Sequence, residues 1–198
     1  MAYHHSSSHP LLLDERSLPS FRATFGALLS RSTTVETAIR QIRLGAVDLS
    51  TAELAQVTRL RVLLAEVNTR TVEGEAYAMA VDPSKGENLN RVLSLLRTGI
   101  LEIRSAPLGG WSPDFSVFSS QGGPQNVLLG LHWFHQPFPH RGPAWATRLG
   151  AEEASAAQAR FLEIWSSAHN IAPAIRRLME RNRPPRRLHP VDTPNSPG

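Results

Sequence analysis

Three segments decide the fold: RLRVLLAEV at residues 59–67, LNRVLSLL at 89–96 and ILEIR at 100–104. The first contains a nearly continuous apolar run of strand length, which is typical of a strand buried on both faces. The second has apolar residues at helical spacing, so it predicts an amphipathic helix that ends near Gly99. The third predicts a short strand. A strand, a helix and a strand in this order favour parallel pairing of the two strands.

Apolar spacing on either side of this unit predicts a larger sheet covered by helices. Further strands are expected at residues 35–44, 115–119 and 127–131. Further helices are expected at residues 21–30, from Ser50 with a capping box to Glu53, at 152–168, and after Asn170. We therefore expect an α/β fold with a mixed β-sheet flanked by helices. Strands should be parallel where helices connect them and antiparallel where short turns do.

The composition suits one globular domain. The chain has 198 residues, 41% of them hydrophobic, which is enough for a sizeable core. We expect this domain at residues 13–182, between a disordered polar tail at 1–12 and a disordered Pro/Arg-rich tail at 183–198. The absence of Cys excludes disulfides, thiolate nucleophiles and Cys-ligated zinc. No apolar run approaches the roughly 20 residues that cross a bilayer, and the first residues do not resemble a signal peptide. A cytoplasmic protein without membrane contact is therefore expected.

Positive charge is concentrated at the C-terminal end. The chain has 21 Lys and Arg against 17 Asp and Glu, a net charge of +4. Residues 1–175 contain 15 basic and 15 acidic residues, whereas residues 176–198 contain six Arg and two acidic residues. Such a stretch binds the phosphates of nucleic acid or an acidic partner, or it is only a solvated helix end and tail. The candidate binding residues are Arg176, Arg177, Arg181, Arg183, Arg186 and Arg187.

The order of segments is similar to one half of a phospholipase D superfamily domain, of the type found beside helicases and nucleases. The segments that carry the resemblance are RLRVLLAEV (59–67), NLNRVLSLLRTGILEIRSAPL (88–108), WSPDFSVF (111–118) and NVLLGLHWF (126–134). Phe161 and Trp165 match the aromatic helix that closes such a domain. The resemblance covers roughly residues 20–170 and implies the α/β sandwich of that family. It also implies a homodimer, because the family's active site needs two motif copies.

The catalytic motif of the family is not retained. In the family, an H-x-K pair supplies the nucleophilic His and a phosphate-binding Lys, and a G-S-x-N strand supplies further phosphate contacts. The alignment places Ser112 at the His and Asp114 at the Lys, and it retains Gly130 of the second motif. Asp114 would repel a phosphate by about 1–4 kcal/mol at 4 Å. The resemblance therefore implies a pseudoenzyme in which these three positions are vestigial. No cofactor is expected, because no glycine pair has a dinucleotide or Walker spacing.

Histidines near the second motif leave an enzyme open as the alternative. His132 stands where it can act as a relocated nucleophile of a phosphodiesterase or nuclease, or as an acid/base partner of Asp114. Together, His132, His135 and His140 form a weak metal-site candidate, since no Cys or paired acid completes a zinc set. The alternative to both is a His-bearing loop packed on the domain.

The leading hypothesis is a degenerate domain that works by binding. Trp111 and Trp133 flank the former phosphate cleft, where they either stack on bases or fill the pocket. The expected partners are nucleic acid or another protein, in a DNA-processing or defence-type assembly. A purely structural protein-interaction module is a further alternative.

Overall fold

The computed structural model describes residues 11–13, 18–42, 52–82, 86–106, 111, 114–130 and 144–182. These residues form eight strands and five helices. The strands are β1 (Leu11–Leu13), β2 (Thr34–Ile39), β3 (Arg59–Leu64), β4 (Leu101–Ser105), β5 (Phe115–Ser120), β6 (Gly123–Gly130), β7 (Ala144–Leu149) and β8 (His169–Asn170). The helices are α1 (Leu18–Leu29), α2 (Thr69–Val81), α3 (Gly86–Thr98), α4 (Ala151–Ser167) and α5 (Ala172–Arg181).

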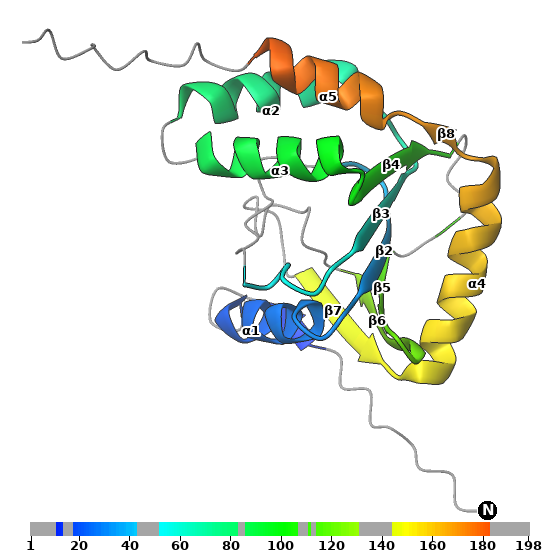
Figure 1. Ribbon diagram of the computed structural model, residues 1–198. Helices are drawn as coiled ribbons and strands as arrows, with labels where there is room; N and C mark the ends of the chain where they lie inside the picture. Colours follow the sequence, from blue (N-terminus) through cyan, green and yellow to red (C-terminus); the bar gives the residue numbers. More distant parts are fainter. Residues whose placement is uncertain are drawn as a thin grey trace, which may run out of the picture.

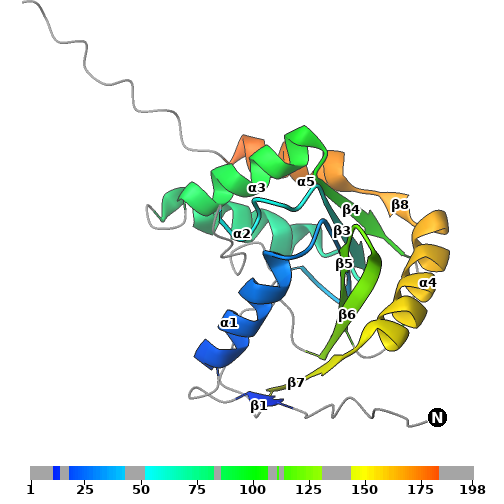
Figure 2. The same cartoon turned by 60° about the horizontal axis from the view of Figure 1, so that its bottom comes forward.

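All eight strands belong to one mixed sheet, in the order β1-β7-β6-β5-β2-β3-β4-β8. The pairs β2–β3 and β3–β4 are parallel, because helices or longer connections separate these strands in the chain. The pairs β5–β6 and β6–β7 are antiparallel, as is β2–β5. Figure 2 shows β1 and β7 at the end of the sheet away from β8. The mixed α/β sheet predicted from the sequence is confirmed.

Helices cover both faces of the sheet (Figure 1). On one face lie α1, α2, α3 and α5, whereas α4 lies on the other. This arrangement follows from strand alternation, because successive side chains point to opposite faces. In β3, Leu60, Val62 and Leu64 join the core under the four helices, while Leu63 joins the core under α4.

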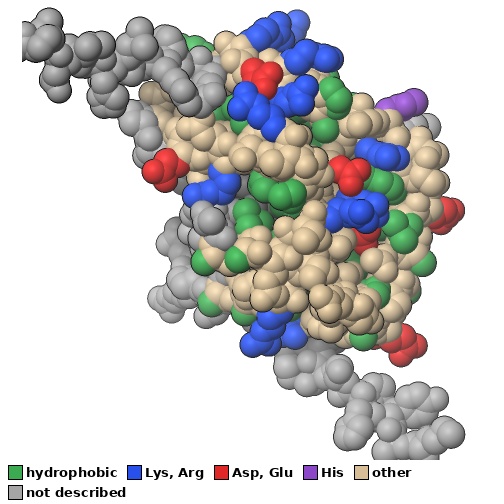
Figure 3. All heavy atoms as spheres, in the orientation of Figure 1, with side chains coloured by type: hydrophobic (Ala, Val, Ile, Leu, Met, Phe, Trp, Pro, Cys, Tyr) green, Lys and Arg blue, Asp and Glu red, His purple; other side chains and the backbone are tan. Residues whose placement is uncertain are grey.

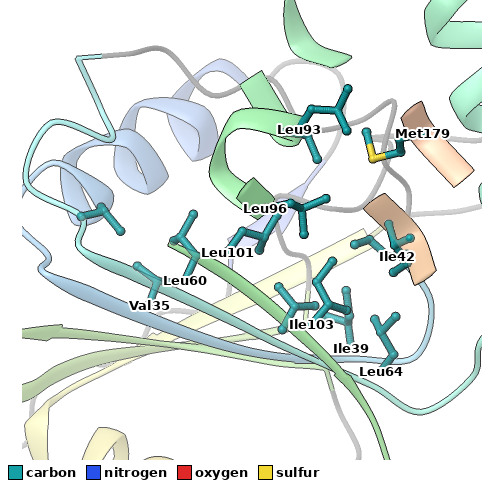
Figure 4. Packing of buried hydrophobic residues seen from close by; sticks show 14 of the residues in the cluster. Val35, Ile39, Ile42, Leu60, Leu64, Leu93, Leu96, Leu101, Ile103 and Met179 are labelled. Atoms are coloured by element: carbon teal, nitrogen blue, oxygen red, sulfur yellow. The ribbon is translucent and has the colours of Figure 1, made fainter. Parts of the chain in front are cut away.

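The larger core lies between the parallel strands and the four-helix layer. Figure 4 shows Leu60 and Leu64 of β3 with Leu101 and Ile103 of β4, below side chains of α3 and α5. From these helices come Leu93, Leu96 and Met179, each less than a tenth exposed. The buried face of α3 follows the helical spacing expected from its sequence.

The smaller core lies between the sheet and α4. Phe161 is fully buried and stacks on Trp165 with ring centroids 5.3 Å apart. Phe115 of β5 belongs to this core, whereas Phe118 belongs to the larger one. The two phenylalanines therefore lie on opposite faces of one strand, as their odd spacing predicts.

Four elements, namely β1, α2, β7 and β8, are not predicted from the sequence, and a helix is predicted where none forms. The sequence contains no strong signal for α2, because only Val72, Ala76 and Met79 of that helix are buried. It also misses β7 (Ala144–Leu149), which pairs with β6. Residues 52–56 form turns instead of the helix predicted after Ser50. Leu11 and Leu12 pair with β7 in the sheet, although the sequence assigns them to the tail.

Within the described residues, no helix is both long enough and apolar enough to cross a bilayer.

Candidate functional site

The two segments that resemble the catalytic motifs meet at one edge of the sheet. Asp114 immediately precedes β5, and Gly130 is the last residue of β6. The Gly130 N–H donates a hydrogen bond of 2.7 Å to the Asp114 carbonyl oxygen. Because β5 and β6 are antiparallel, the start of one and the end of the other lie side by side. The structure thus brings together Asp114 and Gly130, the two described motif positions.

The Asp114 carboxylate connects this pair to a third strand. Its Oδ1 accepts a hydrogen bond of 3.1 Å from the backbone N–H of Arg40, which follows β2. A backbone N–H that meets a carboxylate forms a charge-assisted bond. The carboxylate therefore bridges the end of β2 and the start of β5. Ionised, it only accepts hydrogen bonds, so it cannot supply the donor that a phosphoryl oxygen requires.

Other polar groups at this edge pair with one another. The Gln41 amide Nε2 donates to Glu66 Oε2 at 2.7 Å, between the residues that follow β2 and β3. The hollow beside this pair, which also contacts Leu64 and Thr71, holds about 10 Å³, roughly one water molecule. Of the described charged residues that directly follow β2 and β3 or precede β5, Asp114 and Glu66 are acidic and Arg40 is basic, so negative charge exceeds positive. This local charge does not favour a phosphate.

The remaining predicted residues of this edge are Ser112, His132, His135, His140 and Trp133, and they lie outside the described residues. Trp111 is described; it is half-buried and packs against the core under α4. The part of the chain that the structure describes contains no group of three potential metal-ligating side chains. The roles of His132 and Trp133 therefore remain predictions.

The arginines at the C-terminal end begin on α5. This helix starts where Asn170 Oδ1 accepts the Ala172 N–H at 3.1 Å, with Pro173 in the first turn. The buried side chains Ile175 and Met179 dock it on the helical layer. This spacing leaves Arg177 and Arg181, four residues apart, on the exposed side.

The α5 arginines do not all share this exposed side. Arg176 is half-buried and lies on the flank of the helix. Arg183, Arg186 and Arg187 lie outside the described residues. Figure 3 shows basic side chains gathered around an acidic one at the end of the molecule where Figure 1 places α5.

An ion pair connects α5 to α3 at this end of the molecule. Glu180 Oε1 accepts two hydrogen bonds from Arg97, one from Nε at 3.0 Å and one from Nη2 at 2.8 Å. Both side chains are partly exposed, Arg97 at 47% and Glu180 at 36%. Sequence reasoning did not find Arg97, because its position in α3 lies far from the C-terminal stretch.

A second charged cluster lies beneath α4, and no pattern in the sequence predicts it. Glu36 of β2 is 1% exposed, and its Oε1 accepts from Arg61 Nη1 at 3.0 Å. Its Oε2 accepts from Gln158 of α4 at 2.6 Å. The guanidinium groups of Arg61 and Arg104 lie over the Trp165 ring, 5.4 and 4.5 Å from its centroid. The cluster is enclosed between sheet and helix, so we assign it a structural role.

No model of a known protein family matches this chain, and no curated protein does. Several solved structures, however, are similar to it. NucT from Helicobacter pylori is 9% identical, with a TM-score of 0.50 over 83% of this chain and 98% of NucT. Nuc from Salmonella typhimurium, a phospholipase D family member, is 11% identical, with a TM-score of 0.49 over 82% of this chain and 98% of Nuc.

TrmBL2, an archaeal chromatin protein whose structure shows a novel mode of DNA binding, is 10% identical with a TM-score of 0.46. That match covers 85% of this chain but only 56% of TrmBL2. At these identities the likeness concerns the fold alone. The chain therefore shares its α/β fold with NucT.

Proposed function

We propose that this chain is a catalytically degenerate phospholipase D-like domain that binds nucleic acid through arginines of α5 and of the segment that follows. The observation that carries the binding is the exposure of Arg177 and Arg181 on one side of α5. Neither forms an ion pair with another described residue. In sequence they lead directly into Arg183, Arg186 and Arg187.

The spacing of these cations supports phosphate as the ligand. Residues four apart on a helix present their side chains about 6 Å from each other, close to the spacing between neighbouring phosphates of one strand. An arginine fork also fits phosphate oxygens well, because its donors are planar and fixed. Up to six contacts are available from the arginines beginning at Arg176, which would give a salt slope near −5 on duplex DNA.

The absence of catalysis is proposed from Asp114. Its carboxylate stands where the family's phosphate-binding Lys is expected, and it is engaged with the Arg40 N–H. Phosphoryl transfer depends on preorganised donors and cations at the reacting group, and a carboxylate provides neither. Ser112 at the nucleophile position supports the same conclusion, since the family chemistry needs an imidazole there.

The proposal extends to assembly. A homodimer is implied by the family resemblance, and a partner protein in a DNA-processing or defence-type assembly is consistent with a domain that binds without cleaving. Light scattering at several protein concentrations tests the dimer. A mass equal to one chain of 21.8 kDa at every concentration would contradict it.

The test of binding is a fluorescence-anisotropy titration of labelled single- and double-stranded DNA and RNA at several salt concentrations. The double variant R177Q/R181Q should weaken binding and reduce the duplex salt slope by about 1.8, since each lost phosphate contact contributes about 0.9. The control R31Q/R160Q removes the same charge from the end of α1 and from α4 and should leave the slope unchanged. Equal slopes for R177Q/R181Q and the wild type would contradict the proposal.

A further inference from the structure

Glu180 is the only acidic residue in α5, and arginines surround it. Arg176 and Arg177 precede it by four and three residues, so they are its neighbours on the helix surface, and Arg181 follows it. Across the helix interface, Glu180 Oε1 holds both Nε and Nη2 of Arg97. One carboxylate therefore engages the Arg97 fork within a surface that is otherwise basic.

The exposure of this ion pair determines how it responds to a competing anion. Arg97 is 47% and Glu180 36% exposed, so water and salt screen their attraction. Exposed pairs of this kind contribute little net stability. A phosphate that approaches Arg97 can therefore replace the carboxylate, but it must then lie beside the negative charge of Glu180. The loss of the Arg97–Glu180 hydrogen bonds and the repulsion between phosphate and Glu180 both weaken a phosphate contact at Arg97.

We propose that Glu180 is a built-in counter-ion that withholds Arg97 from nucleic-acid phosphates and so limits the affinity of this surface. The inference rests on the proposed function and adds Arg97, on α3, to the binding surface of α5. In the free protein the carboxylate occupies the guanidinium fork. When the negative charge is removed, Arg97 becomes available as a further phosphate contact.

The experiment replaces Glu180 with its uncharged isostere. The side chain of E180Q retains an oxygen that accepts from Arg97, so the link between α3 and α5 is preserved without the charge. E180Q should bind duplex DNA more tightly than the wild type, with a salt slope steeper by about 0.9. The gain in affinity should therefore be about 3.5-fold larger at about 50 mM than at about 200 mM salt.

A double-mutant cycle identifies Arg97 as the source of the gain. R97Q alone should change the affinity for duplex DNA little, because the Arg97 guanidinium is already hydrogen-bonded to Glu180. In the E180Q background, R97Q should remove the additional slope. The two substitutions are thus expected to be non-additive. E163Q is the matched control, because Glu163 pairs with Arg160 at 2.6 Å on the exposed side of α4, and it should leave the slope unchanged.

The outcomes separate the inference from the function on which it rests. If the wild type binds and E180Q binds equally or more weakly, Glu180 positions Arg97 for phosphate and the counter-ion role is wrong. If R97Q alone lowers the salt slope by about 0.9, Arg97 is already a phosphate contact in the wild type and the inference is also wrong. If the wild type binds no nucleic acid at low salt, the proposed function and the inference both fail. Thermal melts of each variant show whether a change in binding reflects loss of the fold.

Discussion

The backbone N–H of Arg40 donates a hydrogen bond to the Asp114 carboxylate at 3.1 Å, and this contact joins the end of β2 to the start of β5. It gives Asp114 a structural task at the position where the resemblance expects a cation for catalysis. The same residue accepts the Gly130 N–H through its carbonyl oxygen, so three strand ends converge on it. At this edge of the sheet, two oxygens of Asp114 therefore accept hydrogen bonds from the neighbouring strand ends.

The first prediction concerns the stability that Asp114 provides. D114A should lower the free energy of unfolding by about 1.5 kcal/mol, the lower end of the range for hydrogen bonds to charged groups, because Asp114 is only half-buried. Urea denaturation measures the change. E66A, at an exposed carboxylate of the same edge, should cost less than about 0.5 kcal/mol. Equal effects of the two variants would contradict the bridging role of Asp114.

The second prediction concerns catalysis at the same position. D114K restores the cation of the family motif, but Ser112 still stands at the position of the nucleophilic His. The variant should therefore turn over a generic phosphodiester no faster than the wild type. Turnover that appears in D114K would show that the remaining site is competent. Turnover by the wild type that disappears in H132A would favour the alternative enzyme.

The third prediction concerns the buried ion pair under α4. R61A should destabilise the protein by about 3–5 kcal/mol, because it leaves the carboxylate of Glu36 buried without its cation. Arg59 lies two residues earlier on the same face of β3, but its side chain is 52% exposed. Its Nε is 4.0 Å from Glu102 Oε1, which is long for an ion pair. R59A should therefore cost at most about 1 kcal/mol. If the two losses were alike, burial would not govern the strength of these pairs.

The fourth prediction concerns the core under α4. F161A should cost about 3–5 kcal/mol, because it leaves a cavity where a fully buried ring stacks on Trp165. The neighbouring Leu162 is 41% exposed, so L162A should cost much less. Chemical denaturation of both variants checks the contrast. A small loss in F161A would mean that α4 is loosely attached to the sheet.

The fifth prediction uses two glycines. Gly99 ends α3 with a φ of +74°, so G99A should destabilise by about 1–2 kcal/mol. Gly74 lies within α2, and an added Cβ there would meet nothing within 4 Å. G74A should therefore stabilise the protein by about 0.5–1 kcal/mol. If G99A and G74A shift the melting temperature in the same direction, the different backbone roles assigned to Gly99 and Gly74 are wrong.

Local sequence pattern predicts the parts of this fold that bury a long apolar run or a regular apolar face. The nearly continuous apolar run marks β3, the helical spacing of apolar residues marks α3, and Gly99 marks the end of that helix. In contrast, α2 buries only a valine, an alanine and a methionine, so its pattern does not stand out from a loop. The strand β7 has six residues, as β3 has, but its sequence AWATRL contains no long apolar run, and it is defined by its pairing with β6 and β1.

Of the candidate sites, too, only some could be predicted from the sequence. The meeting of Asp114 and Gly130 follows from the motif order, because neighbouring antiparallel strands bring such positions together. The pair between Arg97 and Glu180 depends on how α3 and α5 pack, and residues 83 positions apart show no sign of it in sequence. The ion pair of Glu36 and Arg61 depends on parallel strand register in the same way.

One experiment tests together whether this domain binds nucleic acid and whether it leaves the bound strand uncleaved. Labelled single- and double-stranded DNA and RNA are incubated with the protein at low salt, with and without divalent metal ions. Each sample is analysed for bound fraction and for intact strand length. We expect salt-sensitive binding with every strand intact. Cleaved strands, or no binding of any of these nucleic acids, would contradict it.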